Sequence, residues 1–303
     1  MTSQRTLRRQ TSCAGIGLHS GNKVTLSLKP AAVDTGIRFR RADLGGLEVL
    51  ATVDHVCGIN YATGLARDAV SVDTVEHLLA ALVSLGIDNV IVELNSPEVP
   101  IMDGSAAPFI YLIQEAGIKE LPAPRRFVKV LRPLTIARGD KRIAVYPSDH
   151  FKVTYSIAFD HPLLRQQART MRVTEQAFVD EIAPARTFGF LKEVEMLRQQ
   201  GLALGGSLEN AIVIGDTGVL NSALRFEDEF VRHKILDLIG DLALIGHPII
   251  GHVVAHRGGH ALHTEFAAML LADTDAWTLV DSAAPAATDA LPGTMPVKGA
   301  ARA

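Results

Sequence analysis

Residues 74–94, TVEHLLAALVSLGIDNVIVEL, carry a helix and then a strand in the order that sets the fold. Asp73 or Thr74 is available to cap the amino end of the helix, and Gly86 is expected to end it. Residues 89–94 are apolar enough to form a strand. The helix is predicted from five apolar residues at helical spacing, Val75, Leu78, Leu79, Leu82 and Leu85.

The second half of the chain has a similar order. A long amphipathic helix is expected over residues 226–245, ended by Gly246, and a buried strand over residues 248–254. Strands are also expected near the start of each half, over residues 24–28 and 127–131. Such an order indicates an internal duplication, which places His77 and His233 on comparable helices facing the boundary between the halves.

Length and composition narrow the class of protein. A chain of 303 residues favours two domains, and Pro122-Ala123-Pro124 is typical of a linker between them. The net charge is −3 with no basic run, so we expect no nucleic-acid partner. Two cysteines exclude a disulfide scaffold and fit a reducing cytosol. We expect no secretory signal and no transmembrane helix, and we interpret residues 282–303, rich in Ala and Pro, as a flexible tail.

Three polar residues share one stripe of the second expected helix. His233 and Asp237 are four residues apart, so an imidazole and a carboxylate there can bind one divalent ion. Asp241 extends the stripe by one turn. The same spacing is also common on solvated helix faces, so the pattern alone leaves both interpretations open.

Other residues suit proton transfer. Glu76 precedes His77, and a glutamate beside a metal-activated water is a natural general base, although it would also complement a helix amino end. His260 follows two glycines and could donate a proton, or it could simply occupy a turn. Thr187 lies between an arginine and two aromatics, as in many packed loops. The HExxH, P-loop, dinucleotide and GxSxG motifs are absent from the sequence.

Taken together, these stretches resemble the LpxC family of UDP-3-O-acyl-N-acetylglucosamine deacetylases. The resemblance covers residues 4–280 in order, and no catalytic position departs from the family pattern. The matching blocks are residues 15–21 (GIGLHSG), 74–78 (TVEHL), 100–106 (PIMDGSA), 185–190 (ARTFGF), 201–207 (GLALGGS), 224–237 (LRFEDEFVRHKILD) and 259–262 (GHAL).

The resemblance implies an α+β fold of two duplicated sandwich domains, each a sheet with a helical layer, with the active site between the helix layers. The domains would span residues 1–124 and 125–281. The family's zinc ligands match His77, His233 and Asp237. One Zn²⁺ per chain is expected, and Fe²⁺ suits the same ligands.

The resemblance also assigns the proton carriers. Water at the metal would attack the substrate with Glu76 as general base and His260 as general acid, oriented by Asp241. Lys234 would face negative charge, and Thr187 is expected to donate to the oxyanion.

The implied reaction removes the N-acetyl group from UDP-3-O-(3-hydroxyacyl)-N-acetylglucosamine, giving acetate and the free amine, the committed step of lipid A biosynthesis. We expect a cytoplasmic monomer. Arg257 and Lys141 are weaker candidates for diphosphate contacts, and residues 186–202 for the acyl passage, because Phe188, Phe190 and Leu191 are apolar. Two alternatives remain: a zinc N-deacylase acting on another acylated sugar, and a structural metal module. A fused dehydratase is disfavoured, because no second catalytic domain fits after residue 281.

Overall fold

Two five-stranded sheets with the same internal order form the framework of the molecule. The computed structural model describes residues 2–59, 61–161, 164, 166–221 and 223–281. The first sheet has the order β2-β3-β9-β4-β5, built from β2 (Thr11–Ile16), β3 (Lys23–Pro30), β4 (Ile37–Arg41), β5 (Leu47–Leu50) and β9 (Val90–Leu94). The second has the order β12-β13-β19-β14-β15, built from β12 (Leu134–Arg138), β13 (Lys141–Tyr146), β14 (Lys152–Ile157), β15 (Gln167–Arg172) and β19 (His252–His256).

The pairing directions repeat as well. Strand β9 runs antiparallel to β3 and parallel to β4, while β19 runs antiparallel to β13 and parallel to β14. In each half the last strand in sequence therefore enters the middle of the sheet between two hairpins. The predicted α+β fold of two duplicated halves is confirmed.

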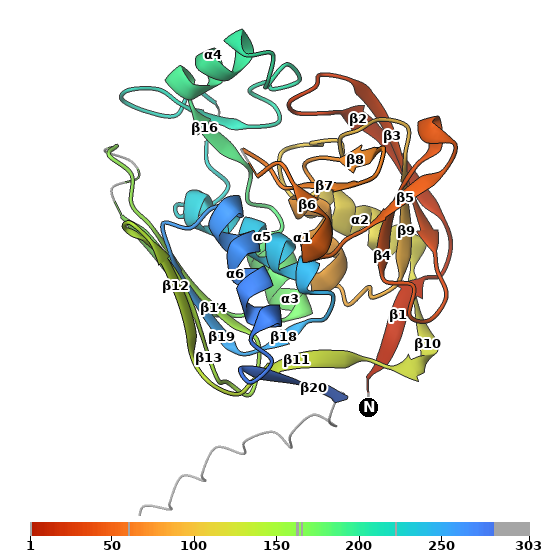
Figure 1. Cartoon of the computed structure of the whole chain (residues 1–303). Coiled ribbons are helices and arrows are strands. Elements are labelled where there is room, and N and C mark those ends of the chain that lie inside the picture. Colours follow the sequence, from red (N-terminus) through yellow and green to blue (C-terminus); the bar gives the residue numbers. More distant parts are fainter. Residues whose placement is uncertain (1, 60, 162–163, 165, 222, 282–303) are drawn as a thin grey trace, which may run out of the picture.

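Helices occupy equivalent places in the two halves. Helix α1 (Glu76–Ser84) precedes β9, and α5 (Glu229–Leu242) precedes β19. Helix α2 (Ala107–Ala116) follows β9, and α6 (His260–Ala272) follows β19. Figure 1 shows α1, α5 and α6 lying between the two sheets. Residues 76–82 of α1 are all buried, as expected of a helix covered on every side.

The backbones of α1 and α5 touch where the helices cross. A Cβ atom at Gly240 would lie 2.0 Å from the carbonyl oxygen of Glu76, which no side chain tolerates. Glycine at this position therefore brings α5 against the first residue of α1. Because Glu76 and His77 begin α1, this contact sets the distance between the polar residues of the two helices.

Smaller elements surround this framework. Strand β1 (Ser3–Leu7) pairs with β10 (Ile118–Pro124), and β11 (Arg126–Val130) lies between β18 (Ile249–Ile250) and β20 (Trp277–Asp281). A third small sheet contains β6 (Val56–Cys57), β7 (Gly64–Arg67) and β8 (Val70–Val72). Strands β16 (Phe188–Phe190) and β17 (Ile212–Ile214) form a lobe with α4 (Leu191–Gln199), at the top of Figure 1. Short helical turns complete the described chain: η1 (Ala42–Leu44), η2 (Val53–His55), α3 (Glu175–Ala177), the π-helical η4 (Phe178–Ile182) and η5 (Ala243–Ile245).

Four local predictions were wrong. Pro122 and Pro124 lie in strand β10, not in a linker, because a two-stranded sheet leaves room for residues that donate no ladder bond. Residues 248–254 hold two strands in different sheets. No side chain caps α1, because Thr74 adopts a left-handed φ of 59° and its hydroxyl donates to Glu98. His260 begins helix α6 (His260–Ala272) and does not occupy a turn.

The boundary at residues 124 and 125 stays a prediction, and it falls between β10 and β11. The predicted tail, residues 282–303, lies outside the described residues. No helix in the described part of the chain is long and apolar enough to cross a bilayer.

A cavity of about 630 Å³ opens at the carboxyl-terminal ends of α1 and α5, lined by Val83, Leu242 and Phe127 among others. The polar residues predicted from the sequence lie elsewhere.

Candidate metal centre and active site

Three buried donors from both halves converge between α1 and α5. Asp237 Oδ1 lies 3.2 Å from His233 Nε2 and 3.6 Å from His77 Nε2. The rings of His77 and His233 meet edge to face, with centroids 4.9 Å apart. Ligands around a tetrahedral zinc ion sit about 3.3 Å from one another, so these separations suit one metal ion.

Hydrogen bonding around the three donors also fits a cation. His233 Nδ1 donates to the carbonyl of Ala185 at 3.0 Å, which leaves Nε2 with a free lone pair. Asp237 Oδ1 is buried and has no hydrogen-bond partner among the described residues. Two electron-rich atoms thus face each other in a buried site, which a metal ion would bridge.

Lys234 holds the other oxygen of the aspartate. Its Nζ donates to Asp237 Oδ2 at 2.8 Å. Burial alone would raise the pKa of Asp237, but His233 and Lys234 hold that pKa well below its ordinary value. Asp237 is therefore a carboxylate, the form that binds metals.

Glu76 lies beside this group at the start of α1. Burial raises the pKa of its carboxyl group, and His260 and His77 partly oppose that rise. One carboxylate oxygen accepts the backbone N–H of Thr63 at 3.1 Å, and the other lies 3.9 Å from His260 Nε2. Glu76 and His260 thus lie close enough together for both to reach one reacting group placed beside them.

Asp241 orients His260 from behind. His260 Nδ1 donates to Asp241 Oδ2 at 2.9 Å, so Nε2 points toward Glu76 and Asp237. Burial lowers the pKa of His260, but Asp241 outweighs it and raises that pKa to about 9. His260 is consequently protonated near neutral pH, as a proton donor must be.

Sequence reasoning missed the rest of this network. His263 Nδ1 also donates to Asp241 Oδ2, at 2.8 Å, and its Nε2 meets the hydroxyl of the buried Tyr155 at 3.0 Å. Thr63 donates to the other oxygen of Asp241 at 2.5 Å. Gly258 allows this packing, because a Cβ there would lie 2.8 Å from both His263 and Tyr155. The HxxH spacing of 260 and 263 would have been a signal had a helix been expected there.

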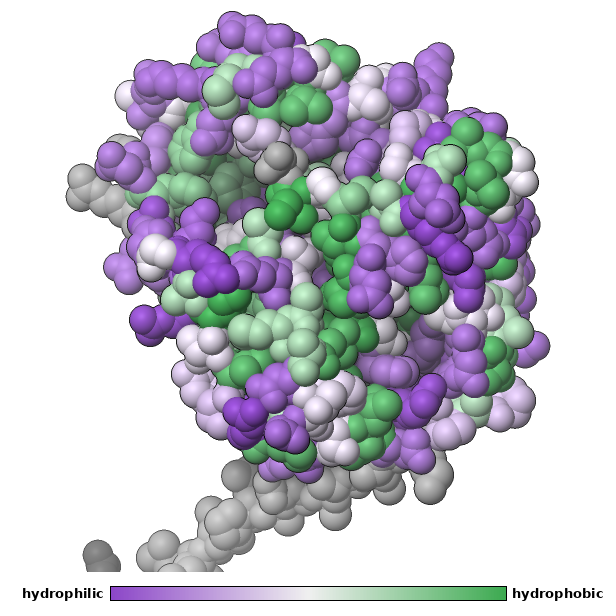
Figure 2. All heavy atoms as spheres, viewed as in Figure 1, coloured by the Kyte–Doolittle hydropathy of each residue, from purple (hydrophilic) through white to green (hydrophobic). Residues whose placement is uncertain are grey.

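Thr187 and Phe188 belong to the segment after Ala185, which runs beside His233. The ring centroid of Phe188 is 6.2 Å from that of His233 and 6.0 Å from that of Phe159. The hydroxyl of Thr187 makes no hydrogen bond within the described residues, whereas its backbone is bonded to Gly104. Figure 2 shows the surface hollowed between the lobe of β16, α4 and β17 and the rest of the molecule.

Two predicted cations lie away from the three metal-type donors. Arg257 Nε is 3.1 Å from Asp140 Oδ2, so this guanidinium is already paired at the turn between β12 and β13. Lys141, the residue after Asp140, begins strand β13. Neither residue contacts His77, His233 or Asp237 in the described structure, and their diphosphate role stays a prediction.

The geometry agrees with comparison to known proteins. A family model described as LpxC, UDP-3-O-acyl N-acetylglycosamine deacetylase, matches residues 4–272. The chain belongs to the LpxC family. Among its relatives, a UDP-3-O-acyl-N-acetylglucosamine deacetylase of Pseudomonas entomophila is 53% identical over 284 residues, covering 92% of this chain and 94% of that protein.

Two further relatives carry the same name. The protein of Acidithiobacillus ferrooxidans is 50% identical, covering 93% of this chain and 94% of its own length. That of Citrifermentans bemidjiense is 48% identical, covering 93% of each chain. The match to the LpxC family model therefore covers both five-stranded sheets and all the residues of the site.

Proposed function

We propose that this chain hydrolyses the acetamide of UDP-3-O-(3-hydroxyacyl)-N-acetylglucosamine, releasing acetate and UDP-3-O-acyl-glucosamine in the cytoplasm, as the committed step of lipid A biosynthesis. The observation that carries this proposal is the placement of Glu76 and His260, 3.9 Å apart, beside the three metal-type donors. A site that only held a structural metal would not need a buried base facing a buried acid.

His77, His233 and Asp237 would hold one Zn²⁺, leaving a fourth position open, and Fe²⁺ suits the same ligands. When bound, the metal would lower the pKa of a water molecule at the site and polarise the acetamide carbonyl. Asp241 and the Ala185 carbonyl hold His260 and His233 in the orientations that this chemistry requires.

Glu76 would remove a proton from water as the water oxygen adds to the acetamide carbon. The C–N bond then breaks, and the nitrogen takes a proton from His260 Nε2, because an unprotonated amide anion is too basic to leave. Lys234 and the Thr187 hydroxyl would stabilise the negative charge that develops on the carbonyl oxygen. Phe188, which packs against His233, and Phe190, which packs against Phe159, would provide an apolar surface suited to the acyl chain.

The test is acetate release by the full chain loaded with one equivalent of Zn²⁺. Glu76→Ala and His260→Ala should each lower kcat by about 10²–10⁴-fold. Glu120→Ala is the matched control, since Glu120 is exposed on β10 and has no part in the proposed mechanism. No acetate from the folded, metal-loaded wild type would reject this substrate, and turnover of a different N-acylated sugar would then support the other deacylase.

A further inference from the structure

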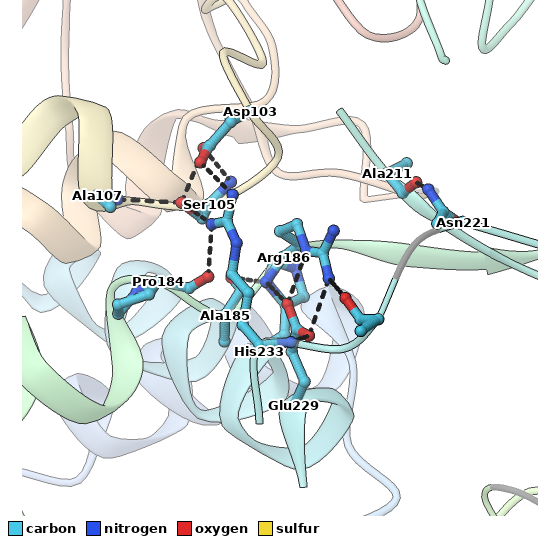
Figure 3. Close-up of polar contacts among 12 residues, drawn as sticks. Asp103, Ser105, Ala107, Pro184, Ala185, Arg186, Ala211, Asn221, Glu229 and His233 are labelled. Atoms are coloured by element: carbon cyan, nitrogen blue, oxygen red, sulfur yellow. Dashed lines mark hydrogen bonds and ion pairs between the residues drawn. The ribbon is translucent and has the colours of Figure 1, made fainter. Parts of the chain in front are cut away.

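A buried ionic cluster lies directly behind His233. Arg186 and Glu229 are 7% and 0% exposed, and two parallel bonds join them: Nε to Oε1 at 2.8 Å and Nη2 to Oε2 at 3.1 Å. Figure 3 shows both side chains pointing toward one another beside His233. The catalytic scheme makes no use of either residue.

The cluster joins three of the sequence blocks that gave the family resemblance. Arg186 belongs to the block at 185–190, and Glu229 to the block at 224–237. Arg225, from the latter block, donates to Asp103 Oδ2 at 2.9 Å and to the Pro184 carbonyl at 2.8 Å. Asp103 comes from the first half of the chain, so the cluster spans both halves (Figure 3).

The carboxylate of Glu229 is fully occupied. Besides the two bonds from the Arg186 guanidinium, it accepts the backbone N–H groups of Arg186 at 3.0 Å and Arg225 at 2.6 Å. Burial raises the pKa of Glu229, but the hydrogen bonds from Arg186 outweigh it and lower that pKa below its ordinary value. A buried ion pair of this kind contributes little net stability compared with apolar residues, so its presence here calls for another reason.

The geometry at one peptide group supplies that reason. The N–H of Arg186 donates to Glu229, and the carbonyl of Ala185, on the same peptide group, accepts from His233 Nδ1 at 3.0 Å. Glu229 and His233 are one turn apart on α5. Because a trans peptide is planar, with its N–H and C=O pointing in opposite directions, the two side chains hold its two ends.

We propose that Glu229, with Arg186 as its counter-ion, is a positioning residue that fixes the Ala185–Arg186 peptide and thereby holds His233 as the tautomer that presents Nε2 to a metal ion. This inference rests on the ligand role proposed for His233. It adds a carboxylate that contacts neither substrate nor metal but acts on the metal through one peptide group.

Metal affinity is the direct readout. Glu229→Gln keeps the shape of the side chain but weakens the hold on the peptide, and replacing such outer partners costs about 10–100-fold in metal affinity. Zn²⁺ dissociation constants would be measured by chelator competition on the full chain, and the Co²⁺ absorption spectrum would report changed ligand geometry. Asp228→Asn is the matched control: Asp228 is the preceding residue and pairs with Arg232 and Arg169, away from the peptide.

We expect Glu229→Gln to weaken Zn²⁺ binding at least tenfold and to alter the Co²⁺ spectrum, with Asp228→Asn within threefold of wild type. A purely structural pair would instead lower the melting temperature of the metal-free protein and leave metal affinity within threefold, which overturns the proposal. If Glu229→Gln does not fold, Arg186→Lys is judged by the same limits. Unchanged metal affinity in His233→Gln would refute the ligand assignment itself, which separates the two failures.

Discussion

Replacing Gly240 with alanine has two opposing effects on stability: it raises the helix propensity of α5, and it overpacks the contact between α5 and α1. Alanine is favoured over glycine in a helix interior by about 1 kcal/mol, so local preference alone predicts a more stable protein. In the structure, however, the new Cβ would lie 2.0 Å from the Glu76 carbonyl oxygen and 2.7 Å from its carbon. Backbone atoms cannot rotate away, so α1 and α5 must separate by about 1.4 Å to lengthen this contact to an ordinary 3.4 Å.

Overpacking of this kind costs up to about 3 kcal/mol, so after the gain in propensity Gly240→Ala should lose about 2 kcal/mol of unfolding free energy. The separation also moves Glu76 and His77 away from Asp237. A misplacement of about 1 Å is enough to lower the rate about 10²-fold. Activity should therefore fall further than stability alone explains.

Urea denaturation of the metal-free protein and acetate release by the metal-loaded protein measure the two effects. Gly218→Ala is the control, because a Cβ there meets nothing within 4 Å, and its stability should change by less than about 0.5 kcal/mol. A Gly240→Ala protein that is as stable as wild type, with wild-type turnover, would refute the argument that backbone contact fixes the site.

Three further outcomes are expected. The alkaline limb of kcat/KM should fall near pH 9, where His260 loses its proton, and Asp241→Asn should move that limb to lower pH; a limb that stays in place would contradict the orienting role. Tyr155→Phe leaves His263 Nε2 without a partner and should cost about 1–2 kcal/mol in urea denaturation, with an unchanged midpoint as the contrary result. At a free Zn²⁺ concentration of 1,000 times the Kd, removing the metal with a chelator should lower the unfolding free energy by about 4.1 kcal/mol. Calorimetry with and without chelator measures this difference, and His77→Ala should abolish it.

The sequence predicts the parts of the fold whose signal is local. Helices α1 and α5 follow from apolar spacing, and Gly86 and Gly246 end their segments with positive φ values of 71° and 83°. Strand β10 was missed because proline is read as a chain breaker, yet it is compatible with a narrow two-stranded sheet. Local patterns do not record which neighbour a segment pairs with.

The same limit applies to the site. Glu76, His77, His233 and Asp237 could be proposed because neighbours on a helix have fixed spacing. Thr63 and His263 reach Asp241 only through tertiary packing, across 178 and 22 positions of sequence, and Tyr155 reaches His263 across 108. The roles of Glu229 and Arg186 likewise depend on one peptide group whose orientation no sequence pattern records.

The metal-type donors are divided unequally between the halves, and this has a consequence for synthesis on the ribosome. When the first sheet and α1 have emerged, the nascent chain carries Glu76 and His77 but none of the donors on α5. If His77, His233 and Asp237 hold the ion as proposed, the nascent chain would need all three to bind it stably, so metal loading would follow the synthesis of residue 237. Metal capture would then report that both halves have folded and docked, so an incompletely made chain would not acquire hydrolytic activity.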